Sequence, residues 1–282
     1  MFTAVPGPML GCMRVLIIGA SGYLGGELRR RARAAGHEVV GTAWSSRRDD
    51  LSRLDVRDRA AVDRFVGAVA PEVVVNAAYV QSDWATTAVG PVNVATVCAA
   101  RAVRFVHVSS DAVFIGGDRE VYDETCAPAP STPYGAAKAA AEVGVAAAHA
   151  SALIVRTSWI LGDGRSPFES FVRALAGGAA GALFDDDVRS PVHVGDLAAA
   201  LVASCASGAA GVLHVAGPES LSRYELGRLV AERDGLDPGT LPKAAKASVT
   251  GSAGAIVRLD SAKAAGVLAV RLRGAREFLR KR

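Results

Sequence analysis

Residues 15–25 read Val-Leu-Ile-Ile-Gly-Ala-Ser-Gly-Tyr-Leu-Gly, and this stretch decides the fold. Four consecutive large aliphatic residues predict a buried strand, and Gly19, Gly22 and Gly25 follow it with the spacing GxxGxxG. The first glycine allows a tight turn, the second lets the backbone approach a pyrophosphate, and the third lets the next helix pack on the strand. Because a helix N-terminus attracts negative charge, we expect a dinucleotide phosphate to bind here.

The alternation of strand and helix continues through the first half of the chain. Short apolar runs predict strands at residues 15–18, 38–41, 73–76, 105–109 and 153–156. Helical patterns lie between them, at residues 24–35, 59–70, 92–101 and 134–148. Continuously apolar strands separated by helices indicate a parallel sheet covered on both faces. With right-handed crossovers this is a doubly wound α/β (Rossmann) fold, whose ligands bind beyond the carboxyl ends of the strands.

The regular alternation ends near residue 157. A loop-rich region follows, with the acidic run 185–187, and helical patterns return only at 196–204 and 221–233, with a strand at 212–215. We therefore predict three parts. Residues 1–12 form a loose extension, residues 13–160 form the dinucleotide-binding domain together with about 190–210, and residues 161–282 form mainly a smaller substrate-binding cap.

The composition excludes several classes of protein. Of 282 residues, 50% are hydrophobic and 21% charged, which suits a packed core. The 32 basic and 28 acidic residues are too evenly balanced to indicate nucleic acid as the partner. No apolar run reaches the roughly 20 residues that a membrane helix needs. Four widely spaced cysteines, with no histidine at metal-ligand spacing, predict a cytoplasmic protein without a metal site.

The end of the second predicted strand bears on the choice of dinucleotide. An NAD site usually has Asp or Glu there, but residues 40–48 contain no acid. Ser45, Arg47 and Arg48 instead suit a 2′-phosphate, because guanidinium groups bind phosphate oxygens in pairs. We therefore predict NADPH, with NADH as the alternative. The other interpretation is that Arg47 and Arg48 are only exposed charges in a loop.

Residues 133–138, Pro-Tyr-Gly-Ala-Ala-Lys, open an alanine-rich helical stretch. The spacing places Tyr134 and Lys138 one turn apart on the same helix face. An ammonium beside a phenol lowers the pKa of the phenol. We expect Tyr134 to donate a proton to a carbonyl oxygen while a hydride reaches the carbonyl carbon.

Together, the glycine turn and the YxxxK pair resemble the extended short-chain dehydrogenase/reductase superfamily, from residue 13 onward. In that superfamily a Ser or Thr at the end of the fourth strand orients the substrate carbonyl. Ser110 matches by position, and Ser109 is the fallback. Segments 75–78, 109–114, 133–135 and 156–159 are similar to the dTDP-4-dehydrorhamnose reductase family. Members of that family reduce the 4-keto group of a nucleotide-linked 6-deoxyhexose with NAD(P)H.

The resemblance implies a set of site residues. The catalytic residues are Ser110, Tyr134 and Lys138. The cofactor is expected to contact Gly19, Ser21, Gly22, Tyr23, Leu24, Gly25, Ser45, Arg47, Arg48, Asp55, Val56, Asn76, Ala77, Ala78, Tyr134 and Lys138. The nucleotide-sugar substrate is expected to contact Asp111, Trp159, Arg189 and His193. By analogy with the superfamily, we also expect a homodimer.

One departure and two other functions qualify this expectation. Ala112 stands where the family often has a tyrosine, which removes a hydroxyl contact to the sugar. An extended short-chain epimerase or dehydratase, or another reductase, that acts on a related substrate is the first alternative. No glutamate follows Asp111, which argues against dehydration. A non-catalytic subunit that binds a cofactor and a partner protein is the second. The joint presence of Ser110, Tyr134 and Lys138 argues against it.

Overall fold

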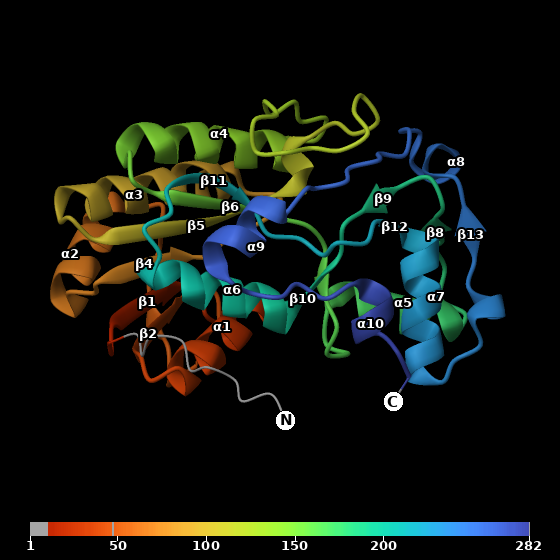
Figure 1. Ribbon diagram of the computed structural model, residues 1–282, viewed down its shortest axis with the longest axis horizontal. Coiled ribbons are helices and arrows are strands. Elements are labelled where there is room, and N and C mark those ends of the chain that lie inside the picture. Colours follow the sequence, from red (N-terminus) through yellow and green to blue (C-terminus); the bar gives the residue numbers. More distant parts are fainter. Residues whose placement is uncertain (1–10, 47, 282) are drawn as a thin grey trace.

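The computed structural model describes residues 11–46 and 48–281, and its centre is a seven-stranded sheet (Figure 1). Neighbouring strands are all parallel, in the order β11-β6-β5-β4-β1-β2-β3. The strands are β1 (Arg14–Ile18), β2 (Glu38–Ala43), β3 (Ser52–Arg53), β4 (Val73–Asn76), β5 (Arg104–Ser110), β6 (Leu153–Thr157) and β11 (Gly211–His214). The predicted doubly wound α/β fold is confirmed. Arg47 and nearly all of the predicted extension lie outside the described residues.

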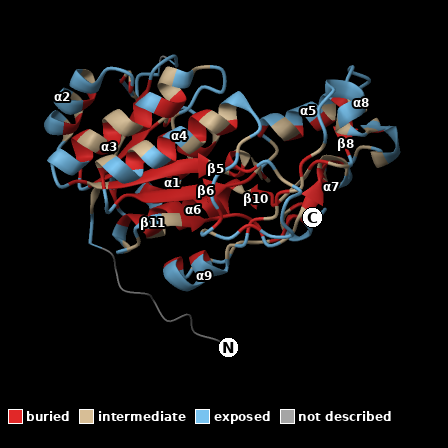
Figure 2. Ribbon diagram, turned by 90° about the horizontal axis from the view of Figure 1, so that it is seen from above, coloured by how far each residue is buried: buried red, intermediate tan, exposed pale blue. Residues whose placement is uncertain are grey.

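Helices cover both faces of this sheet. One face carries α1 (Tyr23–Ala34) and α6 (Val194–Ala206), and the other carries α2 (Arg59–Val69), α3 (Gly90–Ala100) and α4 (Pro133–Ala148) (Figure 1). The central strands β1, β4, β5 and β6 are largely buried between these helices (Figure 2). Val15 and Ile17 pack toward α1 and α6, whereas Leu16 and Ile18 pack toward α2 and α3. Both faces of β1 are therefore covered, which explains why its sequence is continuously apolar.

The strand order reverses at β1, which lies between β2 and β4. In a doubly wound sheet, a crevice for ligands forms at this reversal, outside the carboxyl ends of the strands. The glycine turn follows β1, Asn76 ends β4 and Ser110 ends β5. The topology thus brings three separate segments of predicted site residues to one edge of the sheet.

The remaining elements build a C-terminal lobe beside this edge (Figure 1). Its elements are β7 (Ile160–Leu161), α5 (Pro167–Ala176), β8 (Leu183–Phe184), β9 (Val188–Arg189), β10 (Val192–His193), β12 (Leu221–Ser222), α7 (Arg223–Asp234), β13 (Lys243–Ala244), α8 (Lys246–Thr250) and α10 (Ala275–Phe278). The lobe has a small core of its own, which includes Leu161, Val172, Leu183 and Leu226. Helix α9 (Ala262–Leu268) instead packs against the core of the large sheet.

Two sequence-based expectations were wrong in this lobe. Residues 167–176 form helix α5 rather than loop, and its start carries the Ser166/Glu169 capping box with Pro167 at the first helical position. The helix expected at 221–233 begins at Arg223, because Leu221 and Ser222 pair with β9 as strand β12. The capping box therefore sets the start of α5, and the pairing of β12 with β9 sets the start of α7.

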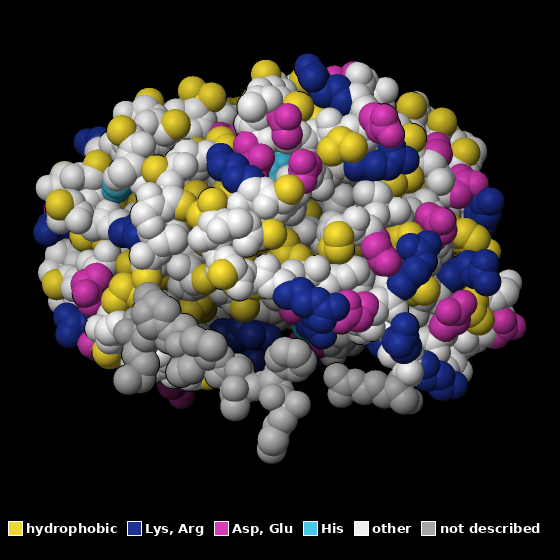
Figure 3. All heavy atoms as spheres, in the orientation of Figure 1, with side chains coloured by type: hydrophobic (Ala, Val, Ile, Leu, Met, Phe, Trp, Pro, Cys, Tyr) yellow, Lys and Arg dark blue, Asp and Glu magenta, His cyan; other side chains and the backbone are white. Residues whose placement is uncertain are grey.

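The surface shown in Figure 3 carries mixed charge. Basic and acidic side chains lie side by side over the end of the molecule that holds α7. Across the part of the chain that the structure describes, no helix is both long and apolar enough to cross a membrane.

Candidate active site

A cavity of about 420 Å³ lies at the carboxyl ends of β1, β4 and β5, between the sheet and the C-terminal lobe. Twelve predicted site residues line it: Gly19, Gly22, Tyr23, Leu24, Gly25, Ala77, Ser110, Asp111, Tyr134, Lys138, Trp159 and Arg189. Residues expected to bind a cofactor and residues expected to bind a substrate therefore share one space. The geometry permits both molecules to meet in it.

The glycine turn is shaped by a very close backbone approach. A Cβ atom on Gly25 would lie 2.2 Å from the carbonyl oxygen of Gly19, a distance that no side chain can accept. The N-cap residue of α1 is Gly22, which makes no side-chain cap, and the start of this helix lines the cavity. Uncapped N–H groups at a helix N-terminus form an anion site. The turn therefore fits the diphosphate of a dinucleotide.

A pair of neighbouring glycines tests this packing. We expect Gly25→Ala to destabilise the protein by about 1–3 kcal/mol, because the new methyl group forces the turn open. Gly26→Ala is the matched control, since Gly26 lies in the same helix and a Cβ atom there meets nothing within 4 Å. It should stabilise the helix by up to about 1 kcal/mol. Urea denaturation measures both, and equal effects would contradict the assignment.

Tyr134 and Ser110 come together through the start of α4. Thr132 caps this helix by accepting a hydrogen bond from the Gly135 N–H at 3.0 Å, which sets Tyr134 in the first turn. A Cβ atom on Gly135 would lie 2.1 Å from the Ala112 carbonyl oxygen, so the turn after Ser110 packs directly on α4. The Ser110 hydroxyl itself donates to the Asp111 carboxylate at 3.2 Å. The Thr132 cap and the absence of a side chain at Gly135 thus bring the segments that carry Tyr134 and Ser110 together.

Lys138 is buried in α4, one helical turn after Tyr134. Its ammonium donates to the Val108 carbonyl oxygen at 2.9 Å and lies 5.3 Å from the centre of the Tyr79 ring. Burial lowers the pKa of Lys138 to about 8. Burial and the neighbouring Tyr79 raise the pKa of Tyr134, with Ser110 acting in the opposite direction. The pKa of Tyr134 therefore lies above its ordinary value, in the direction opposite to the lowering expected from the sequence, because the phenol is buried.

Ser109 is not available to orient a substrate. Its hydroxyl donates to Glu142 at 2.5 Å, and the same carboxylate forms a buried ion pair with Arg156 at 2.7 Å. The side chains of Glu142 and Arg156 are only 5% and 3% exposed. Ser109 is held in this buried network at 2.5 Å, whereas Ser110 makes only a longer bond of 3.2 Å to its neighbour Asp111, so Ser110 stays the predicted partner of a carbonyl.

The opposite wall of the cavity combines an aromatic ring with buried charges. Trp159 stacks on Phe168 at 5.6 Å, and the Arg223 guanidinium lies 4.6 Å from the Trp159 ring. Asp187 is buried between Arg189 and Arg223, with ion-pair distances of 2.9 Å to each. Burial lowers the pKa of Arg223, while Asp187 opposes the shift. This wall offers a flat apolar face and a guanidinium at its edge.

The three residues of the acidic run 185–187 each contact different partners. Asp185 pairs with Lys243 at 2.9 Å, Asp186 accepts the backbone N–H of Lys246 at 2.9 Å, and Asp187 lies between the two arginines. Among residues 11–46 and 48–281, no group of three or more metal-ligating side chains is placed to hold an ion.

Comparison with known proteins places this geometry in a family. The model of the RmlD substrate binding domain matches residues 13–276. A dTDP-4-dehydrorhamnose reductase of Mycolicibacterium smegmatis is 39% identical over 242 residues, which cover 80% of this chain and 70% of that protein. The chain belongs to the RmlD substrate-binding domain family.

Two further relatives illustrate the range of this family. A dTDP-4-keto-6-deoxy-D-glucose reductase of Streptomyces niveus is 32% identical over 238 residues, covering 80% of each chain. A dTDP-4-dehydrorhamnose reductase of Bacillus anthracis, solved in complex with NADP, has the same fold. It aligns with a TM-score of 0.82 and 24% identity over 95% of this chain and 97% of that one. The predicted family and the expectation of an oxidoreductase are confirmed.

Some predicted residues of this RmlD family chain lie outside the cavity lining. They are Ser21, Ser45, Arg48, Asp55, Val56, Asn76, Ala78 and His193. The substrate role expected for His193 does not agree with its position: its ring caps α6 by accepting the Gly195 N–H at 3.0 Å and packs edge-on against Phe278. Arg48 pairs with Asp50 at 3.2 Å.

Asn76, one of these residues outside the lining, supports the site from below. The side-chain oxygen Oδ1 of Asn76 accepts a hydrogen bond from the Ala78 N–H at 3.1 Å, which fixes the turn after β4. Its amide contacts His107 at 3.3 Å, and burial lowers the pKa of that histidine well below its usual range. Asn76 therefore positions Ala77, which does line the cavity.

Several lining residues of this family member were not predicted, among them Tyr79, Arg223 and Lys246. Tyr79 packs 5.7 Å from the Tyr134 ring, and its place just after the end of β4 was a usable signal. Arg223 and Lys246 are the first residues of α7 and α8 in the C-terminal lobe, and no sequence motif marks them.

Proposed function

We propose that this protein reduces the 4-keto group of a dTDP-linked 6-deoxyhexose with NADPH. The observation that carries the proposal is the shared cavity, which the phosphate-binding turn and the Ser110, Tyr134 and Lys138 triad line together. Relatives of the same family are named for reduction of dTDP-linked 4-keto sugars. We infer the substrate and the direction of the reaction from the names of these relatives, because the cavity of this chain suits the same reaction.

NADPH is the dinucleotide that the edge of the sheet favours. β2 ends without an acidic residue, and Arg53 stacks 4.2 Å from the centre of the Trp44 ring beside that edge. A structural relative binds NADP. The predicted contact of Arg47 lies outside the described residues and stays a prediction. NADH is the alternative, and the ratio of KM values for the two dinucleotides decides between them.

Tyr134 is the proposed proton donor. When bound, the nicotinamide supplies a hydride to the carbonyl carbon. The carbonyl oxygen then gains negative charge, and Tyr134 gives it the phenolic proton to complete the alcohol. The raised pKa of Tyr134 keeps that proton in place at neutral pH. Ser110 holds the oxygen by hydrogen bonding, and the Lys138 charge stabilises the tyrosinate that remains.

The far wall suits a sugar diphosphate. Trp159 presents its ring to the cavity, and aromatic faces pack well against the C–H surface of a sugar. Arg223 and Lys246 bring positive charge to the same wall, and phosphate oxygens bind such groups. Lys246 forms no ion pair with any of the described residues, so its charge is free for a ligand.

The buried lysine predicts a pH dependence. Lys138 carries its charge below a pKa of about 8 and loses it as the pH rises through that value. We therefore expect kcat/KM for the reduction to fall above about pH 8, with one proton lost. A profile of kcat/KM against pH measures this limb. A flat profile up to about pH 10, the range of an ordinary lysine, would contradict the role.

The activity is tested with purified protein and a set of keto sugars. NADPH oxidation is followed with dTDP-, UDP- and GDP-linked 4-keto-6-deoxyhexoses, and we expect stoichiometric consumption with the dTDP form. An epimerase regenerates its dinucleotide, so sugar conversion without net NADPH oxidation would favour that alternative. A lack of turnover with every sugar, together with a protein partner that co-purifies, would favour a non-catalytic subunit.

A further inference from the structure

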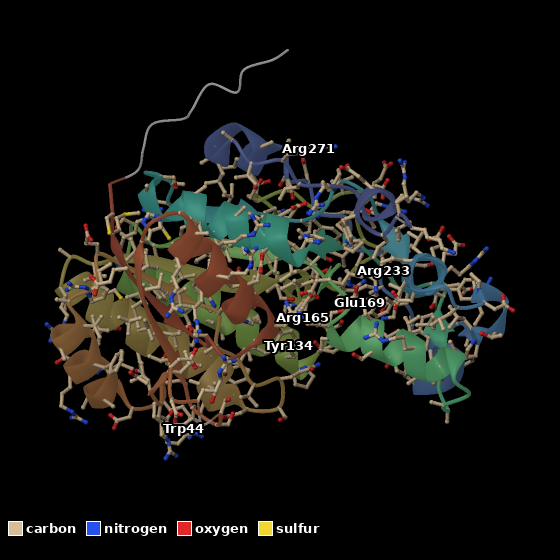
Figure 4. The ribbon with its side chains drawn as sticks, turned by 90° about the horizontal axis from the view of Figure 1, so that it is seen from below. Trp44, Tyr134, Arg165, Glu169, Arg233 and Arg271 are labelled. Carbon is tan, nitrogen blue, oxygen red and sulfur yellow. The ribbon has the colours of Figure 1, made fainter. Side chains whose placement is uncertain are left out.

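The loop of residues 162–165, between β7 and α5, is fixed firmly to the C-terminal lobe. The buried carboxylate of Glu169 accepts the N–H groups of Gly162 at 3.2 Å and Gly164 at 3.1 Å. Glu169 also pairs with Arg233 of α7, so one carboxylate ties the loop to two helices. In the view of Figure 4, Arg233, Glu169, Arg165 and Tyr134 follow one another in that order across the molecule.

One side chain joins this loop to the phosphate-binding turn. Tyr23 is the first residue of α1, and its hydroxyl donates to the Asp163 carboxylate at 2.6 Å. Tyr23 lines the cavity, and the Asp163 loop leads to Pro167, which lines it as well, so the bond joins the α1 side of the cavity to the C-terminal lobe. Arg165 holds the same carboxylate through its Nε and Nη2 atoms at 2.9 and 2.5 Å.

We infer that the Tyr23–Asp163 hydrogen bond is a clasp over the bound dinucleotide, which opens each time the dinucleotide enters or leaves. The inference rests on the proposed function, because it requires a dinucleotide on the glycine turn. A dinucleotide carries a ring system at each end and its diphosphate in the middle. Tyr23 directly follows the glycine turn that is expected to hold the diphosphate, so the closed clasp fixes the loop of the C-terminal lobe beside the diphosphate position.

The charges around the clasp are compatible with a diphosphate. Asp163 alone would repel phosphate oxygens, but the Arg165 guanidinium neutralises it. The Arg165 side chain is 74% exposed, so its remaining donors stay free for a ligand. Asp163 thereby positions a cation beside the turn while it holds Tyr23. The C-terminal lobe thus contributes to cofactor exchange as well as to the substrate wall.

The test is the rate of dinucleotide exchange in Tyr23→Phe. Because the bond is present before binding and closes again afterwards, its loss leaves the Kd for NADPH within about twofold. Both the association and the dissociation rate should rise about tenfold, the effect of one hydrogen bond to a charged group. Stopped-flow fluorescence of NADPH with the full-length protein, without sugar, measures both rates.

Two further variants sharpen this test. Tyr224→Phe is the matched control, because Tyr224 packs against the core of the C-terminal lobe and its hydroxyl bonds to none of the described residues. We expect unchanged rates in this variant. Asp163→Ala removes the same bond from the other side and replaces Tyr23→Phe if that variant does not fold. The double variant should exchange no faster than either single variant, since both act through one bond.

The outcomes separate this inference from the proposed function. Faster association and dissociation in both single variants, without further acceleration in the double variant, support the clasp. Wild-type rates in both variants overturn it, as does a Kd that rises through faster dissociation alone, which would make Tyr23 a direct ligand. If the wild-type protein binds neither NADPH nor NADH, the proposed function is overturned together with the clasp.

Discussion

Tyr134→Phe should lower kcat/KM for the NADPH-dependent reduction by about 10²–10⁴-fold, the usual contribution of a positioned proton donor. Phenylalanine keeps the ring that packs 5.7 Å from Tyr79 but has no proton to give. Thr132 and Gly135 set the start of α4, so the fold of the site is preserved. Steady-state kinetics with the dTDP-linked keto sugar measure the loss.

Binding measurements separate this chemical effect from a structural one. The Kd of NADPH should stay within about twofold of the wild-type value, because the removed hydroxyl is only one of many predicted cofactor contacts and its proton is used by the carbonyl oxygen. Tyr224→Phe, at a residue that packs against the core of the C-terminal lobe, should keep full activity. If Tyr134→Phe retains nearly full turnover, another group donates the proton and the assignment of Tyr134 is wrong.

Glu142→Gln should reduce the free energy of unfolding by about 3–5 kcal/mol. Glu142 pairs with Arg156 at 2.7 Å in the interior and also accepts the Ser109 hydroxyl. Glutamine has nearly the same shape but no charge, so the Arg156 guanidinium remains buried without a counter-ion. Urea denaturation of both proteins measures the difference.

An exposed ion pair provides the control for this effect. Asp63 pairs with Arg101 at 2.9 Å, but the two side chains are 52% and 38% exposed. Asp63→Asn should therefore change the free energy of unfolding by less than about 1 kcal/mol. If Glu142→Gln costs no more than Asp63→Asn, the buried pair does not hold α4 against β6.

The first half of the fold was predictable because local sequence and tertiary packing agree there. The run 15–18 is apolar on both faces because both faces of β1 are covered, and the glycine spacing directly encodes the close approach of Gly25 to Gly19. The YxxxK pair was equally readable, since a single helix carries both residues. In each case, a short segment contains the whole physical constraint.

The C-terminal lobe was less predictable because its constraints join distant segments. Arg223 reaches the cavity only because β12 pairs with β9 and α7 begins immediately afterwards. His193 has the residue type of a ligand, but the start of α6 uses its ring as a helix cap. The Tyr23–Asp163 bond joins residues 140 positions apart, and no local pattern encodes such a contact.

The transfer of a labelled hydride tests the central claim most directly. NADPH with deuterium at the transferable position of the nicotinamide is incubated with the protein and dTDP-4-keto-6-deoxyhexose, and the product is examined by NMR and mass spectrometry. We predict one deuterium at sugar C4 for each NADPH consumed. Product without deuterium at C4, or sugar conversion without NADPH consumption, would contradict the proposed reduction.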